Sequence, residues 1–142
     1  MVELTEEQQY VFNEYRTGKN IFITGPGGTG KSELLKLIYN DAKHNGIKVH
    51  ITALTGCAAI LLGCGANTIH SFSGIGLCNG SQDVIIEKSL KKRKARANWK
   101  SASLLIIDEV SMMSRKIFDV LNELGQYARL NSKPFGRIQV IA

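Results

Sequence analysis

Apolar residues follow two kinds of spacing along the chain, and the two kinds alternate. In three segments apolar side chains recur at every third or fourth position, which places them on one face of a helix; these segments are 5–16, 31–43 and 115–129. Four shorter runs are apolar and rich in β-branched residues, the pattern of buried strands; these runs are 20–24, 47–54, 103–107 and 137–142. A short helical stretch at 58–62 leads into a glycine-rich loop that runs through Ser81.

The alternation of strands with helices predicts a single α/β domain. Helices between successive strands act as crossover connections, which make the strands parallel and cover both faces of the sheet. The chain has 142 residues, the length of one domain with a core of its own. Neither an internal repeat nor a Ser/Pro-rich linker divides it. We therefore expect a parallel sheet flanked by helices.

The positive charge of the chain comes from one segment. The formal net charge is +6, and residues 88–100 hold seven Lys or Arg and no acidic residue, which leaves −1 (6 minus 7) for all other residues. This distribution indicates one local contact with an anion, or one solvated helix, and not a uniformly cationic surface.

Composition also excludes several classes of protein. The longest apolar runs, such as 58–62 and 104–107, are far shorter than the roughly 18–20 residues that span a membrane, and residues 1–9 lack the features of a secretory signal. An odd number of cysteines without CxxC spacing is typical of a reducing compartment. Together with the histidines they match no zinc-binding pattern, so we expect small core thiols; the cysteines are Cys57, Cys64 and Cys78. These features predict an intracellular protein.

The strongest chemical motif is GPGGTGKS at 25–32, which fits GxxxxGK[ST] and lies between an expected strand and an expected helix. Such a loop points successive backbone N–H groups at phosphate oxygens, and the helix N-terminus adds partial positive charge. Lys31 is expected to reach the β- and γ-phosphates, and the Ser32 hydroxyl to hold Mg²⁺. The alternative is a glycine-rich turn that binds nothing. The predicted nucleotide-binding residues of the motif are Gly25, Pro26, Gly27, Gly28, Thr29, Gly30, Lys31 and Ser32.

Two adjacent acids, Asp108 and Glu109, end the apolar strand LLIIDE. In a parallel sheet the carboxyl end of this strand lies at the same edge as the phosphate loop. Asp108 is expected to hold Mg²⁺, through water, and Glu109 to polarise the water that attacks the γ-phosphate. The alternative is an acidic cap for the next helix.

Four motifs together resemble the Pif-type (petite integration frequency) DNA helicases of superfamily one; they are GPGGTGKS, TALTGCAA at 52–59, TIHSFSGIG at 68–76 and LLIIDEVSMM at 104–113. The similarity extends from LTEEQ at 4–8 to PFGRIQVIA at 134–142. The phosphate loop and the DE pair occur in many ATPases, whereas TIHSFSGIG and DEVSMM are much narrower and decide the family. The resemblance implies a RecA-like P-loop NTPase fold.

The resemblance also implies roles for residues outside the phosphate loop. Gln8 corresponds to the glutamine that reads adenine, although Thr5 and Gln8 also fit a capping box in which Gln8 only caps a helix. Thr55 and Gly56 correspond to a first contact with single-stranded DNA. The second contact corresponds to His70, Ser71 and Phe72, whose hydroxyl, imidazole and ring suit phosphates and bases. The alternatives are a packed Phe72 and a core-facing His70.

The basic segment allows several interpretations. KKRK at 91–94 is typical of a nuclear import signal or a nucleic-acid contact, and Trp99 could stack on a base. The alternative is a solvated, mobile helix or loop. We favour a loose contact with the DNA backbone.

The function implied by the resemblance is ATP-dependent DNA unwinding. Its cofactors are ATP and Mg²⁺, its partners are single-stranded DNA and duplex junctions, and its setting is repair and recombination in the nucleus or the mitochondrion. Members of the family continue beyond the strand at 137–142 with a γ-phosphate sensor and a second RecA-like domain. We therefore expect residues 1–142 to be a first RecA-like domain that is truncated at its C-terminal end. The missing second domain would act in cis or in trans. Such a chain is expected to bind nucleotide weakly and not to unwind DNA alone. Alternatives are another P-loop ATPase, such as a helicase loader or a nucleotide kinase, and a non-catalytic nucleotide-binding remnant.

Overall fold

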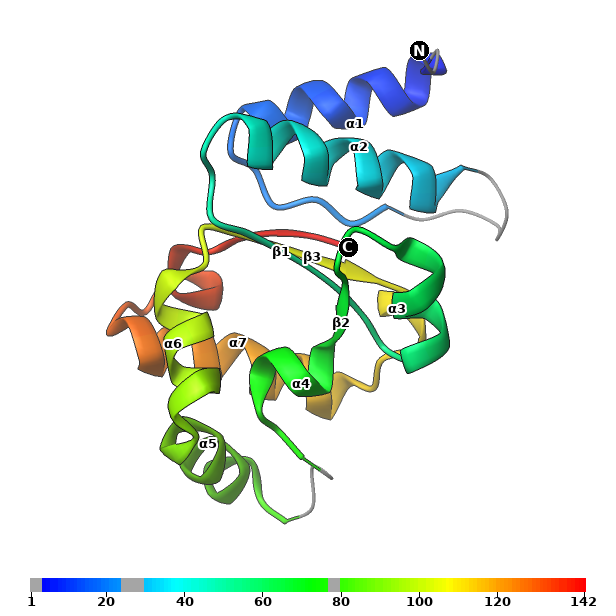
Figure 1. Ribbon diagram of the computed structural model, residues 1–142. Coiled ribbons are helices and arrows are strands. Elements are labelled where there is room, and N and C mark those ends of the chain that lie inside the picture. The colour runs from blue at the N-terminus through cyan, green and yellow to red at the C-terminus, as the bar shows by residue number, and fades with distance from the viewer. Residues whose placement is uncertain (1–3, 24–29, 77–79) are drawn as a thin grey trace.

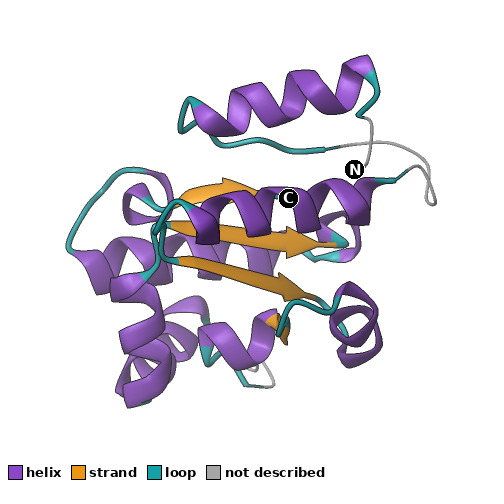
Figure 2. Ribbon diagram, turned by 45° about the horizontal axis from the view of Figure 1, so that its top comes forward, coloured by secondary structure: helices purple, strands orange, loops and turns teal. Residues whose placement is uncertain are grey.

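A parallel sheet forms the centre of the protein, and helices cover both of its faces (Figures 1 and 2). The computed structural model describes residues 4–23, 30–76 and 80–142. Within these residues the elements, in chain order, are α1 (Glu6–Arg16), α2 (Lys31–His44), β1 (Val49–Ala53), α3 (Gly56–Leu62), β2 (Asn67–Thr68), α4 (Ile69–Ser73), α5 (Gln82–Lys91), α6 (Arg93–Ser101), β3 (Leu104–Asp108), the 3₁₀ turn η1 (Val110–Met112), α7 (Arg115–Arg129), the 3₁₀ turn η2 (Pro134–Arg137) and β4 (Gln139–Ile141).

The strand order in the sheet is β2-β1-β3-β4, and every pair is parallel. Ala53 at the end of β1 lies beside Thr68 of β2 on one side and beside Asp108 of β3 on the other. Because all strands run in the same direction, their carboxyl ends meet at one edge, where ligands of α/β proteins bind. We call this the carboxyl edge.

Strand β3 is buried along its whole length and separates two cores. Leu105 and Ile107 pack into the core that lies under α4, α5, α6 and α7, whereas Leu104 and Ile106 pack into the core that lies under α1, α2 and α3. A strand covered on both faces needs apolar residues at every position. The continuous run LLII therefore predicted this placement, and the expected α/β fold is confirmed.

The segment 20–24 differs from the expected strand. In its described part, Ile21 forms an isolated parallel bridge with Ile141. The Ile21 N–H donates to the carbonyl of Val140, and the Ala142 N–H donates to the carbonyl of Ile21. The segment therefore runs beside β4 as expected, but these residues form a single bridge and no strand; Thr24 lies outside the described residues.

The glycine-rich loop expected after residue 62 also differs, because it contains β2 and α4. The strand is only two residues long, and α4 begins directly after it, where the Thr68 side chain accepts a hydrogen bond from the Ser71 N–H. Five residues are too few for a recognisable helical period. The glycines that flank α4 therefore obscured it in the sequence.

The basic segment forms two helices, α5 and α6, which meet at Lys92. Trp99 is 0% exposed and packs edge-on against Phe72, with ring centroids 5.0 Å apart. The expectation that Trp99 stacks on a base is therefore wrong, because its indole is part of the core. No helix of the described residues is long and apolar enough to cross a membrane.

Candidate functional site

The best-defined polar contact at the carboxyl edge joins α2 to β3. The Ser32 hydroxyl, in the first turn of α2, donates to the Asp108 carboxylate at 3.3 Å, although the two residues are 76 positions apart. Asp108 is 8% exposed, and its other carboxylate oxygen accepts the Glu109 N–H at 2.9 Å. A hydroxyl and a carboxylate oxygen are ligands that suit Mg²⁺. The donor set therefore fits the metal that the sequence predicts here.

Glu109 follows with a strained backbone and an unsatisfied side chain. Its φ of 63° lies in the left-handed region, which costs a non-glycine residue roughly 1–3 kcal/mol. Its Oε1 atom is buried and has no hydrogen-bond partner in the described residues. Buried polar groups without partners are rare and call for a functional explanation. The geometry leaves this oxygen available to a water or a substrate group.

The alternative role for the two acids, a cap for the next helix, does not match the structure. Ser114 caps α7 and accepts from the Ile117 N–H. Glu109 stands at the start of η1, and its side chain makes no capping hydrogen bond. The acids therefore stand apart from the cap of α7.

The phosphate-loop residues divide into two groups. Gly25, Pro26, Gly27, Gly28 and Thr29 lie outside the described residues, whereas Gly30, Lys31 and Ser32 are described. Lys31 begins α2, is half-buried and forms no ion pair with an acid of the described residues. Its ammonium therefore carries a charge that no carboxylate neutralises, as expected of a phosphate ligand.

Gln8 connects the start of α1 to the end of the phosphate loop. Its Oε1 accepts the Thr5 N–H at 3.0 Å, and the Thr5 hydroxyl accepts the Gln8 N–H at 3.2 Å, so the capping box is present. The Gln8 Nε2 lies 3.5 Å from the Gly30 carbonyl. Gly30 has a φ of +81°, and a Cβ there would come within 2.9 Å of that nitrogen. The cap thus holds Gln8 beside the nucleotide loop, and a contact with adenine stays a prediction.

The two predicted DNA contacts start at neighbouring strands of the carboxyl edge. Thr55 follows β1 and caps α3 by accepting the Ala58 N–H at 3.1 Å. Gly56 is exposed, and nothing lies within 4 Å of a Cβ built on it. His70 and Ser71 follow β2 in the first turn of α4; Ser71 is exposed and His70 half-exposed. Both loops therefore present small polar groups and helix starts at one edge.

Phe72 takes the packed alternative. It is 2% exposed and lies between two rings, with centroid distances of 4.9 Å to His50 and 5.0 Å to Trp99. No face of its ring is open to a nucleotide base in this arrangement. Phe72 therefore positions α4, and stacking on a base does not fit the structure.

Helix α6 holds the end of α4 through three side-chain donors, which sequence analysis missed. Asn98 Nδ2 donates to the Phe72 carbonyl at 3.2 Å, and Trp99 Nε1 donates to the Ser73 carbonyl at 3.3 Å. Lys92 Nζ, just before α6, donates to the Gly74 carbonyl at 2.7 Å. These contacts satisfy carbonyls that a helix end leaves without intrahelical partners. The sequence offered one signal of these contacts, a Trp inside a charged segment, which indicates a buried side.

The position of Gly74 depends on the same contact. Its φ is +78°, and a Cβ at this position would come within 2.7 Å of the Ala95 Cβ. Only glycine combines this backbone conformation with so close an approach of two helices. Gly74 of TIHSFSGIG therefore serves packing as well as turning.

His50 lies on the same side of the sheet, beside Phe72. It lines a small cavity of about 90 Å³ together with Tyr39, Thr52 and Asn67. Burial lowers the pKa of the His50 imidazole below its ordinary value of 6.5. His50 is therefore neutral at physiological pH.

Among the described residues no three His, Cys, Asp or Glu side chains could together hold a metal ion.

Comparisons with known proteins agree on one family. The PIF1-like helicase family description matches residues 3–142. The chain is 41% identical over 140 residues to the ATP-dependent DNA helicase PIF1 of Candida albicans, covering 98% of this chain and 15% of that protein. A crystal structure of the Candida albicans Pif1 helicase matches with a TM-score of 0.90 at 40% identity, covering 100% of this chain and 32% of that one. A Bacteroides Pif1 structure in complex with ADP-AlF3 and ssDNA matches with a TM-score of 0.72 at 32% identity, covering 99% of this chain and 32% of that one. By sequence and by fold, this chain belongs to the PIF1-like helicase family.

Proposed function

We propose that this chain is the ATP-binding RecA-like domain of a DNA helicase, which couples ATP hydrolysis to movement along single-stranded DNA and to duplex unwinding. The observation that carries the proposal is the hydrogen bond between Ser32 and Asp108 beside the unpartnered Glu109 oxygen. A phosphate-loop hydroxyl, a strand-end aspartate and a free carboxylate oxygen are the three groups that ATP hydrolysis requires at one place.

In this proposal the described residues divide the chemistry. Lys31 binds the β- and γ-phosphates, while Ser32 and Asp108 hold Mg²⁺, with the loop at 25–30 around the phosphates. When bound, Mg²⁺ neutralises charge on the β- and γ-phosphate oxygens. Glu109 accepts a hydrogen bond from the attacking water through its buried oxygen. It takes the water's proton as the water oxygen bonds to the γ-phosphorus and the bond from that phosphorus to the bridging oxygen breaks, which releases ADP and phosphate. Gln8, next to Gly30, contacts the adenine.

Single-stranded DNA then lies across Thr55, Gly56, His70 and Ser71. These residues follow β1 and β2, while Asp108 ends β3, the other neighbour of β1. Hydroxyl, backbone and imidazole groups can bind phosphates without a dense positive charge. The loops that bind the DNA strand and the residues that bind nucleotide adjoin along one edge. A shift of β1 relative to β3 would therefore move both groups of residues.

Named relatives support the proposed binding of nucleotide and of single-stranded DNA. The Bacteroides Pif1 structure contains ADP-AlF3 and ssDNA, and it matches this chain at 32% identity. The chain spans 15% of the Candida albicans PIF1. A second RecA-like domain, in cis or in trans, therefore belongs to the proposal, as do DNA junctions, repair and recombination, and the nucleus or the mitochondrion as compartments.

The experiment compares unmodified protein with E109Q and S32A. We expect E109Q to bind nucleotide normally but to hydrolyse ATP about 10²–10⁴-fold more slowly, since it loses the base. S32A should weaken Mg²⁺-dependent nucleotide binding. The matched control is E123Q, which changes a carboxylate on α7, away from the site.

Turnover is measured with and without single-stranded DNA. Stimulation by the strand supports the helicase. Turnover that does not respond to DNA would instead indicate another P-loop ATPase, and nucleotide binding without turnover would indicate a non-catalytic remnant. Full activity of E109Q would exclude the proposed base.

A further inference from the structure

Helix α6 presents cations that neither the nucleotide site nor the strand loops use. Arg93, Arg96 and Lys100 are exposed, and at 3.6 residues per turn they lie within about 60° of one another around the helix axis. Lys43 and Lys48, which precede β1, line an open hollow of about 370 Å³ together with the last residue of α6. We call these five residues the cationic face.

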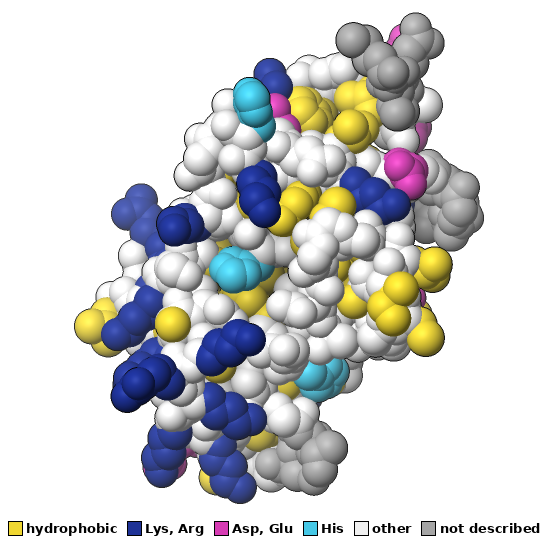
Figure 3. Space-filling model, viewed as in Figure 1, with side chains coloured by type: hydrophobic (Ala, Val, Ile, Leu, Met, Phe, Trp, Pro, Cys, Tyr) yellow, Lys and Arg dark blue, Asp and Glu magenta, His cyan; other side chains and the backbone are white. Residues whose placement is uncertain are grey.

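The charges of the cationic face are not neutralised within the described residues. Its members form no ion pair with an acid there, and the one ion pair of α5 and α6 joins Lys91 to Glu87. The Lys43 ammonium contacts the hydroxyl and the ring of Tyr39. Figure 3 shows dark blue side chains along the side formed by the end of α2, α6 and α5, where magenta is scarce. This side therefore has a positive potential that attracts anions.

The placement of Arg93 and Arg96 opposes the stability of α6. Arg93 stands in the first turn, where the helix dipole favours acids, and Lys92 before it provides no side-chain cap. Arg96 and Lys100 are like charges four residues apart, which repel. Each effect is small by itself. Lys100 lies in the last turn, where the dipole favours a cation, but the charges of Arg93 and Arg96 do not stabilise the helix. An anionic ligand would offset the repulsion among the three.

Helix α6 is held at its C-terminal end, so its charges stand on a fixed support. The Arg129 guanidinium donates from Nη1 to the carbonyls of Trp99, Lys100 and Ala102 at 3.3, 2.9 and 2.9 Å. Trp99 is fully buried, and its indole bonds to Ser73. A mobile, solvated charge run has no such contacts. The alternative of a mobile segment therefore does not describe α6.

We propose that the cationic face binds the phosphate backbone of duplex DNA, apart from the single strand at the carboxyl edge; this rests on the proposed helicase function. From Arg93 to Lys100 the helix rises about 10 Å, a length over which a duplex carries roughly six phosphate charges. The exposed residues of α5 and α6 include no aromatic side chain on which unpaired bases could stack. A membrane-binding helix would require many exposed apolar side chains, and the exposed residues of α5 and α6 include few.

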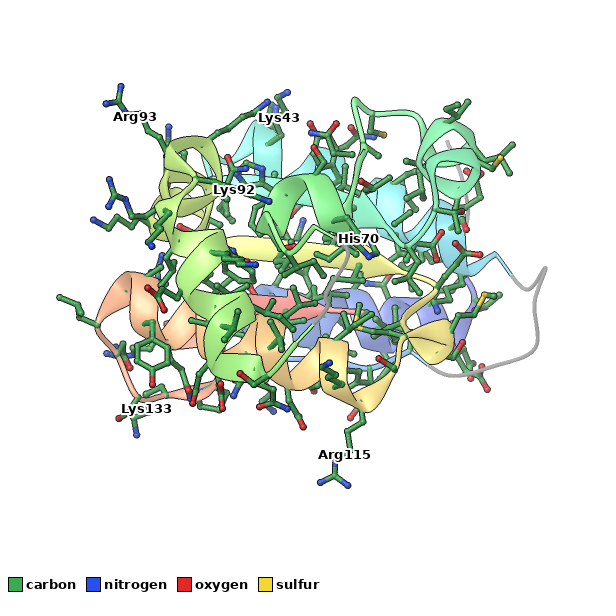
Figure 4. All side chains as sticks on the ribbon, turned by 90° about the horizontal axis from the view of Figure 1, so that it is seen from below. Lys43, His70, Lys92, Arg93, Arg115 and Lys133 are labelled. Carbon is green, nitrogen blue, oxygen red and sulfur yellow. The ribbon has the colours of Figure 1, made fainter. Side chains whose placement is uncertain are left out.

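The test compares R93Q/R96Q with R115Q/K133Q, a control that removes the same charge elsewhere. Figure 4 shows Arg93 and Lys43 extending to one side of the protein, and Arg115 to the opposite side. Binding of a short labelled duplex and of a matched single strand is measured by anisotropy over a series of salt concentrations. For R93Q/R96Q we expect duplex affinity at low salt to fall about tenfold and the slope of log K against log salt to decrease by about 2. The control should change neither, and single-strand affinity should stay within about twofold.

A second measurement separates ligand binding from a structural role. Because the cations repel one another in α6, R93Q/R96Q should melt at the same temperature as the unmodified chain or higher, at low salt. A lower melting temperature, an unchanged duplex slope, or an equal loss of duplex and single-strand binding would each overturn the inference. Failure of the proposed function looks different, because the unmodified chain would then fail to bind single-stranded DNA, or its ATP turnover would not respond to the strand.

Discussion

Individual side chains at this site are defined by what surrounds them. Glu109 follows a buried strand in a left-handed conformation, and its Oε1 atom is buried with no hydrogen-bond partner among the residues that the structure describes. Asp108, one residue earlier, is satisfied by Ser32 and by the Glu109 N–H. Two adjacent carboxylates with such different environments are suited to different roles, one as a metal ligand and one as a base.

His50 gives a prediction at the same scale. Its pKa is lowered in the folded protein, so in the range below 6.5 the unfolded chain binds more protons than the folded one. Stability should therefore rise with pH through that window and be lost as the pH falls below about 6.5. We expect urea unfolding between about pH 7 and pH 5 to show this loss, and H50Q to show a smaller one. H44Q, which replaces an exposed histidine, is the control; an identical pH profile for H50Q would contradict the assignment.

At the scale of elements, α6 explains how a five-residue helix keeps its place. Helix α4 is too short to be stable by itself, yet it carries two of the predicted DNA contacts, His70 and Ser71. The three donors from the α6 side satisfy its last carbonyls. A segment that the sequence marks only by charge thus positions a predicted binding loop.

Trp99→Phe tests this contact. The ring is largely retained, but the Ser73 carbonyl loses its indole donor inside the core, where Ser73 is 0% exposed. An unsatisfied buried carbonyl costs about 1–3 kcal/mol, and we expect this decrease in the free energy of unfolding by urea titration. Single-strand affinity should fall as α4 loosens, while nucleotide binding is retained. The control K100Q, on the exposed side of α6, should leave the free energy of unfolding unchanged. An unchanged free energy of unfolding for W99F would contradict the predicted contribution of the bond.

At the scale of the whole molecule, the sheet brings the residues predicted to bind nucleotide and the loops predicted to bind DNA to one edge. The residues that end β2, β1 and β3 lie side by side there, and Figure 1 shows how segments far apart in the chain converge on this sheet. No Lys or Arg of the described residues pairs with Asp108 or Glu109.

This organisation predicts what the 142-residue chain does alone. In the proposed function, two lobes close on ATP, and the second lobe supplies the cation that stabilises the transition state. We expect the isolated chain to bind ATP·Mg²⁺ weakly and to leave a forked duplex intact in a gel-based unwinding assay. A longer relative of the family, run in parallel, is the positive control. Strand separation by the isolated chain would contradict the prediction.

Local physics made part of this protein predictable from its sequence. The 3.6-residue spacing placed α2 and α7, and the continuous run LLII placed β3. The glycines with Lys31 predict a phosphate loop without any tertiary contact. These features depend on neighbours within one or two turns, which a sequence displays directly. The resemblance at the remaining motifs indicated the family, which the comparisons confirm.

Only the tertiary structure decided which residues meet and which are covered. The contact of Ser32 with Asp108 requires β3 to lie in register with β1 and α2 to pack over both. Phe72 and Trp99 looked available for stacking on bases, yet they are buried against each other, because α6 folds back over α4. Such outcomes depend on packing between segments far apart in the chain, and an amino-acid pattern does not record which surface of a residue its distant neighbours will cover.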